Sequence, residues 1–143
     1  MRKIICLTSI YILSMFLTNC KKDSNYSTSI IGTWELKQGQ GGTTPGTTFP
    51  KGNGNILKFT KSTYEIYENG GLSKSGIYTL IPDNAVQENV CLVLSSSEYK
   101  SRIVFDGKDD ARKTFIKISK DELSLVSGCF AVDAGSISTY ERQ

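Results

Sequence analysis

From Ile30 onward, the chain consists of short segments in which apolar and polar residues alternate. Leu57 and Phe59, for example, alternate with Lys58 and Thr60. Because successive side chains of a strand point to opposite faces, this period of two predicts β-strands that each have one apolar face. The predicted strands are Ile30–Gln38, Asn55–Thr60, Thr63–Glu68, Ser73–Ile81, Val90–Ser95, Ser101–Asp106, Lys113–Ile118, Glu122–Ser127 and Ser136–Arg142.

Turn-forming residues separate these segments, and no long window has a helical period, so the sequence predicts an all-β chain. Short strands joined by tight turns favour an antiparallel meander, either a sandwich or an up-and-down barrel. The run VCLVL at Val90–Leu94 is apolar on both faces, which leaves its orientation open. The turn sequences are ENGG (Glu68–Gly71), PDN (Pro82–Asn84), DGKDD (Asp106–Asp110) and SKDE (Ser119–Glu122).

The first 19 residues have the pattern of an export signal. Arg2 and Lys3 precede an apolar run of 14 residues, Ile4–Leu17, which is shorter than the roughly 20 residues of a membrane-spanning helix. The sequence LTNC, which ends at Cys20, resembles the lipobox of bacterial lipoproteins, in which the cysteine is acylated and the signal is cut before it. Asn19 departs from that pattern, since Gly, Ala or Ser usually precedes the cysteine. The alternative is a plain soluble export signal that is cut near the same place.

The residues after the predicted cleavage site suit a domain held on a tether. Residues 20–29 are polar and lack apolar periodicity, which predicts a flexible spacer. Lys21 differs from the Asp that retains many lipoproteins at an inner membrane, so we expect an anchor in the outer membrane of the cell envelope. Cleavage leaves 124 residues, which suits one domain over residues 30–142. It also removes two basic residues and lowers the formal net charge from +3 to +1, which argues against nucleic acid as a partner.

The cysteines fit an exported protein. Cys6 lies in the predicted signal and Cys20 is the predicted site of lipid attachment, which leaves Cys91 and Cys129. Two cysteines in an oxidising compartment predict a disulfide. A metal pair is the alternative, but two thiols in a chain without histidine make a poor site. We therefore expect neither a metal nor a cofactor.

The only tryptophan, Trp34, lies in GTWEL, where Gly32, Trp34 and Leu36 share the apolar face of the first predicted strand. GTWEL at the head of the domain and TYER at its tail resemble the calycin superfamily, which includes the lipocalins and fatty-acid-binding proteins. In those barrels a G-x-W on the first strand seals one end, and an Arg or Lys of the last strand packs across the Trp. The resemblance implies that Gly32, Trp34 and Arg142 close the barrel and that Tyr140 lines its wall.

Three further motifs resemble the short lipocalin-like domains of many bacterial lipoproteins. They are FTKSTY at Phe59–Tyr64, GIY at Gly76–Tyr78 and YER at Tyr140–Arg142. The resemblance covers Ile30 to Arg142 and implies a small antiparallel up-and-down β-barrel of about eight strands. A β-sandwich that shares these motifs by coincidence is the alternative.

Residues suited to catalysis are scarce. The chain has no histidine, which excludes Ser–His and Cys–His arrangements, and we expect a protein that is not an enzyme. Asp106, Asp109 and Asp110 around Gly107 offer oxygen ligands for calcium. The lysines and arginine among them favour a charged hairpin loop instead.

The segment Gly39–Asn55 is unusual, because its 17 residues include six glycines and two of the three prolines. Structureless loops of this length are uncommon in compact domains and are often functional. The resemblance to lipocalins implies a lid over the open mouth of the barrel, into which Phe49 dips. A mobile insertion without a role is the alternative.

These patterns predict a non-enzymatic binder of a small apolar or amphipathic molecule, because an eight-stranded barrel has either a packed interior or room for one small ligand. The alternative is an interaction protein, an inhibitor or accessory subunit whose barrel is packed and whose loops contact a protein partner. The candidate ligand-binding residues are Phe49, Leu57, Phe59, Tyr64, Ile66, Tyr78 and Tyr140, with Trp34 at the floor of the barrel.

Overall fold

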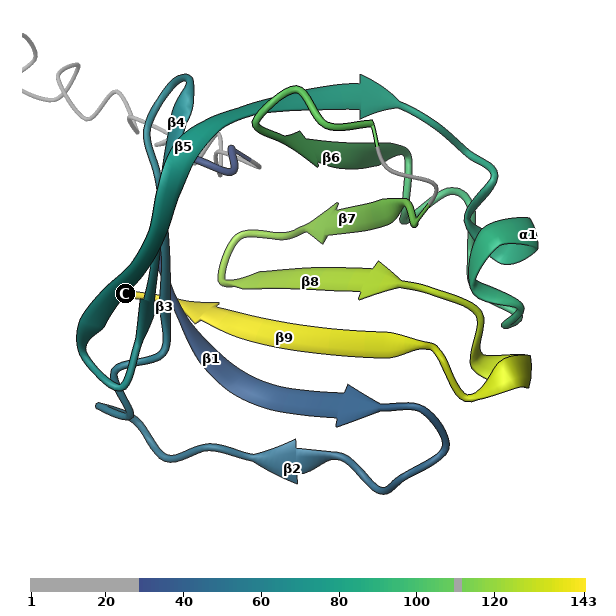
Figure 1. Ribbon diagram of the computed structural model, residues 1–143, viewed down its shortest axis with the longest axis horizontal. Helices are drawn as coiled ribbons and strands as arrows, with labels where there is room; N and C mark the ends of the chain where they lie inside the picture. Colours follow the sequence, from purple (N-terminus) through teal and green to yellow (C-terminus); the bar gives the residue numbers. More distant parts are fainter. Residues whose placement is uncertain (1–28, 110–111) are drawn as a thin grey trace, which may run out of the picture.

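The computed structural model describes residues 29–109 and 112–143, which form one antiparallel sheet of nine strands (Figure 1). The predicted signal peptide, Cys20 and all of the tether but its last residue lie outside the described residues. A short α-helix, α1 (Val86–Val90), and a 3₁₀ turn, η1 (Phe130–Val132), interrupt the strand order. The strands are β1 (Gly32–Gly41), β2 (Thr47–Thr48), β3 (Ile56–Phe59), β4 (Thr63–Glu68), β5 (Gly71–Pro82), β6 (Ser101–Phe105), β7 (Thr114–Ile118), β8 (Glu122–Ser127) and β9 (Ser136–Arg142).

The sheet closes on itself as an up-and-down barrel. From β3 to β9 each strand pairs with the next one in sequence, and β1 pairs with β3 along one edge. The other edge of β1 pairs with β9, from Trp34 opposite Arg142 to Gly41 opposite Ser136. The two-residue strand β2 pairs with β1 at Gln38 and Gly39, beyond the part of β1 that pairs with β3. The predicted fold class, a small antiparallel barrel of about eight strands, is therefore confirmed.

One apolar cluster fills the barrel between its walls. Its members lie on the inward faces that the alternation predicts, for instance Leu57 and Phe59 on β3. Two edge-on aromatic pairs join strands that are one strand apart in the sheet, with ring centroids 5.0 Å apart for Phe59 and Tyr78 and 4.7 Å apart for Tyr64 and Phe105. The buried members are Ile30, Trp34, Leu57, Phe59, Tyr64, Ile103, Ile116 and Leu123.

A second apolar cluster covers the outer face of β7 and β8. Phe115 on β7 pairs with Val126 on β8, and both point away from the interior, because the adjacent Ile116 belongs to the inner cluster. The connection between β5 and β6 lies over them and contributes Val86 and Val90 from α1 as well as Tyr99, while Phe130 of η1 completes the cluster. This part of the wall is therefore buried on both faces.

The predicted strand Val90–Ser95 is wrong, because this segment begins with the last residue of α1 and forms no strand. Val86 and Val90 lie one turn apart on α1, so both reach the outer cluster. Cys91 then ends the helix in a left-handed conformation with φ of 57°. The run at Val90–Leu94 is rich in apolar residues because several of them pack against the outer cluster. A strand buried on both faces would have the same composition, so the sequence suggested a strand here. Neither helical segment in the described residues is long and apolar enough to cross a bilayer.

Cys91 and Cys129 form the predicted disulfide, with their Cα atoms 5.0 Å apart. The bond joins the end of α1 to the start of the connection between β8 and β9. It therefore fastens the β5–β6 connection, called the covering segment below, to the wall. The attachment lies at the same end of the molecule as η1 (Figure 1).

Part of the segment Gly39–Asn55 belongs to the sheet. β1 continues to Gly41, and β2 pairs back onto it, so the glycine-rich sequence begins as a hairpin that extends the sheet. The tip of this hairpin docks on the β8–β9 connection, where the amide of Thr43 donates to the carboxylate of Asp133 at 2.8 Å. The backbone polar groups of this segment thus have partners along much of its length.

Candidate functional site

Trp34 and Arg142 meet at the end of the barrel where β1 begins and β9 ends. The indole of Trp34 is completely buried, and its ring nitrogen donates to the carbonyl of Ile30 at 2.7 Å. The guanidinium carbon of Arg142 lies 4.0 Å from the centroid of the Trp34 ring. This is the arrangement that the GTWEL and TYER motifs imply, and a stacked cation of this kind stabilises a fold by about 0.5 to 2 kcal/mol.

The guanidinium of Arg142 also satisfies backbone groups that the ends of strands leave open. Its nitrogens donate to the carbonyls of Ser29, Ile31 and Lys120 at 2.8, 3.0 and 2.8 Å. Gly32 makes room for this contact, because a Cβ atom there would lie 2.7 Å from the guanidinium, and its φ of 140° disfavours other residues. The closure is therefore a structural plug, distinct from the hollow described next.

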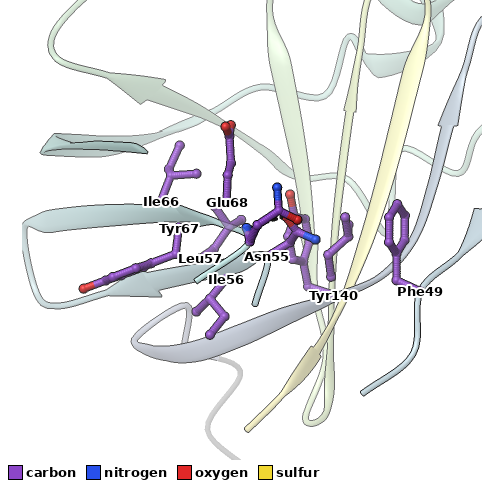
Figure 2. Close-up of a pocket in the computed structure, with 10 residues that line it drawn as sticks. Phe49, Asn55, Ile56, Leu57, Ile66, Tyr67, Glu68 and Tyr140 are labelled. Atoms are coloured by element: carbon purple, nitrogen blue, oxygen red, sulfur yellow. Dashed lines mark hydrogen bonds between the residues drawn. The ribbon is translucent and has the colours of Figure 1, made fainter. Parts of the chain in front are cut away.

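A hollow of about 320 Å³, the interior hollow, lies between the β3–β4 hairpin and β9 (Figure 2). Three pairs of directly opposed residues contribute to its lining. Ile56 and Tyr67 belong to one face of β3 and β4, and the other two pairs lie on the inward face of the sheet. Leu57 pairs with Ile66 across β3 and β4, and Leu36 pairs with Tyr140 across β1 and β9. Figure 2 shows Leu57 and Tyr140 on either side of Asn55, with Phe49 beyond β9. The pairing of strands thus brings residues that are far apart in sequence to the same hollow.

The rim of the interior hollow is polar. Asn55, Glu68 and Asn69 belong to its lining and lie at the ends of β3 and β4. Inside, burial raises the pKa of the Tyr140 hydroxyl, an effect that a hydrogen bond with Ser138 opposes only in part. The hydroxyl is therefore neutral at physiological pH and can donate a hydrogen bond. An apolar interior with polar groups at one side suits an apolar or amphipathic molecule.

The structure brings four of the seven candidate ligand-binding residues together and places the other three elsewhere. Phe49, Leu57, Ile66 and Tyr140 line the interior hollow. Phe59 and Tyr64 are fully buried in the inner cluster, and Tyr78 packs edge-on against Phe59. These three aromatic residues fill the barrel rather than border the hollow, as does Trp34.

Glu35 was missed by the sequence analysis, because it alternates with Trp34 and Leu36 and so belongs to the polar face of β1. It is only 6% exposed, because the turn at residues 50–54 folds over it. Its carboxylate accepts the backbone amides of Gly52 at 3.0 Å and Gly54 at 3.4 Å. This turn connects Phe49 to Asn55, two residues of the hollow, so Glu35 holds one edge of the site in place.

Asn53 fixes the same turn from within. Its side-chain amide donates to the carbonyls of Leu36 at 2.8 Å and Pro50 at 2.7 Å, while its oxygen accepts the amide of Asn55. A glycine next to an Asn in a turn is the only sequence signal for such an arrangement. Residues 50–55, at the end of the expected lid, therefore form a turn whose conformation is fixed by hydrogen bonds.

The described carboxylates of the candidate calcium loop have other partners. Asp106 accepts the hydroxyl of Tyr64 at 2.9 Å and pairs with Lys74 at 3.2 Å. Asp109 pairs with Arg102, while Asp110 lies outside the described residues. No group of three or more potential ligands that could hold a metal occurs within residues 29–109 and 112–143.

Comparisons with models of protein families, with curated protein sequences and with solved structures find no match to this chain. The barrel, its plug and the interior hollow are therefore interpreted from their own geometry.

Proposed function

We propose that this protein is a lipid-anchored, lipocalin-like barrel that binds one small apolar or amphipathic molecule in the interior hollow. The observation that carries this proposal is the hollow itself, with an apolar wall of Leu36, Leu57, Ile66 and Tyr140. Its volume of about 320 Å³ falls at the lower end of the roughly 300–1,000 Å³ typical of ligand sites. The ligand is accordingly small, and the protein is a binder rather than an enzyme.

The closed barrel and its plug support the lipocalin-like part of the proposal. Gly32, Trp34 and Arg142 meet at the end of an up-and-down barrel, as the resemblance to calycins implies. The anchoring part is supported by the sequence LTNC before a polar spacer. Acylation of Cys20 would place the barrel at the outer membrane of the cell envelope, where two or more acyl chains hold a protein stably.

A neutral fluorescent probe, N-phenyl-1-naphthylamine, tests the site on the refolded, delipidated domain. We expect enhanced, blue-shifted emission with the wild type, because the probe enters an apolar environment. Ile66→Trp should reduce the affinity for the probe at least several-fold, since the larger side chain fills the hollow. Ile77→Thr is the matched control, because Ile77 lies on a neighbouring strand but is 59% exposed.

Equal binding by the wild type and Ile66→Trp would place the probe elsewhere and contradict the assigned site. The proposal as a whole fails if neither the probe nor any small apolar compound from a host extract binds. Thermal unfolding of each variant must accompany the titrations, so that loss of binding is separated from loss of fold.

A second candidate function, contact with a protein partner, is favoured by two exposed valines. Val93 is 96% exposed and Val132 is 70% exposed, and they follow Cys91 and Cys129 by a few residues in segments joined by the disulfide. Exposed apolar side chains that gather in one patch mark interaction surfaces, and the disulfide holds together the two segments that carry these valines. Under this alternative, Val93→Ser with Val132→Ser would abolish cross-linking to a specific envelope protein, while probe binding would be absent in the wild type.

A further inference from the structure

A second hollow, the side groove, shares no lining residue with the interior hollow. It has a volume of about 500 Å³ and is bordered by inward-facing apolar residues and by the chain that leads into β6. Leu80 on β5 and Ile116 and Ile118 on β7 form its apolar part. Ser97, Glu98, Lys100, Ser101 and Lys117 supply its polar part.

The groove exists because the wall is incomplete between β6 and β7. β6 begins at Ser101, which is paired with Ile116. Lys117 and Ile118 therefore continue β7 without a partner on β6 among the described strands. The chain before Ser101 leaves the sheet here, and Leu80 remains 36% exposed beside the gap.

The polar side of the groove is held in position by the outer cluster. Tyr99 is buried in that cluster, and its amide donates to the carbonyl of Ser95 at 3.2 Å. The next carbonyl, that of Lys100, accepts the amide of Asp83 at 3.0 Å. Glu98 and Lys100 flank Tyr99, so their backbones are fixed although their side chains reach solvent.

The charges in the groove favour an anion. Two ammonium groups, of Lys100 and Lys117, border it with the single carboxylate of Glu98. Glu98 pairs with Lys117 at 2.9 Å, and this hydrogen bond raises the pKa of Lys117, which therefore stays charged. The ammonium of Lys100 has no ion pair with any residue that the structure describes.

We propose that the side groove binds an amphipathic anion, with its apolar group against Leu80 and Ile118 and its phosphate, sulfate or carboxylate on Lys100. Ser97 and Ser101 offer hydroxyls to the same head group. The site is separate from the interior hollow, because the two linings share no residue and the buried Leu123 lies between Ile118 and Tyr140 in the ladder.

Octyl phosphate, below its critical micelle concentration, is the probe, and amide chemical shifts of the ¹⁵N-labelled domain report where it binds. We expect saturable shifts at Leu80, Ser101 and Ile118. Inorganic phosphate and octanol should each bind much more weakly, because each lacks one half of the ligand. If octanol binds as tightly as octyl phosphate, the groove does not recognise an anionic head group. If inorganic phosphate binds as tightly, the groove does not recognise an apolar group. Either result would overturn the proposal.

Two variants should change the affinity in opposite directions. Lys100→Gln should weaken octyl phosphate binding about two- to five-fold, the size expected for one exposed ion pair. Glu98→Gln should strengthen it by a similar factor, because it frees Lys117 and removes a repulsive charge. Lys58→Gln, on the outer face of β3 and half exposed, should leave the affinity unchanged.

Equal affinity of Lys100→Gln, Glu98→Gln and wild type would overturn the assignment. Shifts confined to Leu36, Leu57 and Ile66 would also overturn it, although they would support the proposed function of the interior hollow. Vesicles of phosphatidylglycerol distinguish two sources of such an anion. Shifts at the groove with these vesicles would indicate a membrane lipid, whereas shifts with octyl phosphate alone would indicate a soluble molecule.

Discussion

At the scale of single residues, the plug shows how one side chain serves several purposes. Arg142 covers the ring of Trp34 and donates to three backbone carbonyls from two separate segments. Position 32 requires glycine for two reasons, because its φ is positive and because a Cβ atom there would collide with Arg142. A substitution at any of these positions therefore affects the others.

Trp34→Ala should lower the free energy of unfolding by about 3 to 5 kcal/mol, as is typical when a large buried side chain is removed. Arg142→Ala should cost less, because Arg142 is only partly buried. The double variant should lose less than the sum of the two, since residues in contact couple. Chemical denaturation of the four proteins measures this coupling, and strict additivity would show that the stacking contributes nothing.

Asp83 gives a prediction about pH. Its side chain is 12% exposed and lies 3.3 Å from Arg102 and 2.9 Å from Lys113. Burial alone would raise the pKa of Asp83, but the hydrogen bonds from Lys113 and the amide of Ala85, with the charge of Arg102, lower it overall. Because the folded pKa is depressed, the stabilisation is fully present above the ordinary value of about 3.9 and is lost as the pH falls below it.

Asp83→Asn should therefore lower the free energy of unfolding by about 1 to 3 kcal/mol at pH 7, since it leaves Lys113 without its carboxylate and Arg102 with Asp109 alone. It should also reduce the loss of stability between pH 5 and pH 3. Thermal unfolding over this range provides the measurement. Asp121→Asn, at a side chain that is 71% exposed, is the control, and an equal effect of both variants would refute the role of Asp83.

At the scale of elements, alternation predicted the strands well wherever one face is polar. β4 and β8 have the bounds expected from the sequence, Thr63–Glu68 and Glu122–Ser127. The pattern failed at Val90–Ser95, because the outer cluster requires apolar residues that do not belong to the wall. α1 has only five residues and is too short to give a periodic signal.

The candidate site was predicted only in part, for a related reason. Leu57 and Ile66 were found because they alternate with polar residues along their strands, and Tyr140 because of the resemblance to calycins. Alternation cannot tell a residue that fills the barrel, such as Phe59, from one that borders a hollow. Nor can it show that a turn folds over Glu35, since that contact depends on tertiary structure.

The covering segment gives a prediction at this scale. Reduction of the Cys91–Cys129 disulfide, or its replacement by Cys91→Ser with Cys129→Ser, should lower the free energy of unfolding. A loop of 38 positions corresponds to about 4 kcal/mol in the chain-entropy model. We expect amide exchange to accelerate first in α1, while the strands on the far side of the barrel, β3 and β4, keep their protection. Uniform acceleration would mean that the segment and the barrel unfold as one unit.

At the scale of the whole molecule, the proposed anchor determines where the barrel acts. Cys20→Ala should move the protein from the membrane pellet to the soluble fraction of its host, because the acyl chains are the proposed attachment. Fractionation with immunoblotting and intact mass spectrometry provides the measurement. A wild type without acyl mass, together with a variant that stays in the pellet, would contradict the proposed anchor.

The pairing of β1 with β9 joins the first folded strand to the last one, and this has a consequence for biosynthesis. A chain leaves the ribosome from its N-terminus, so β1 emerges early and waits for its partner until synthesis is nearly complete. During that time its edge is open to pairing with other chains. The barrel therefore cannot close until the chain is complete, and a product that ends before residue 136 would keep this edge of β1 without its partner strand.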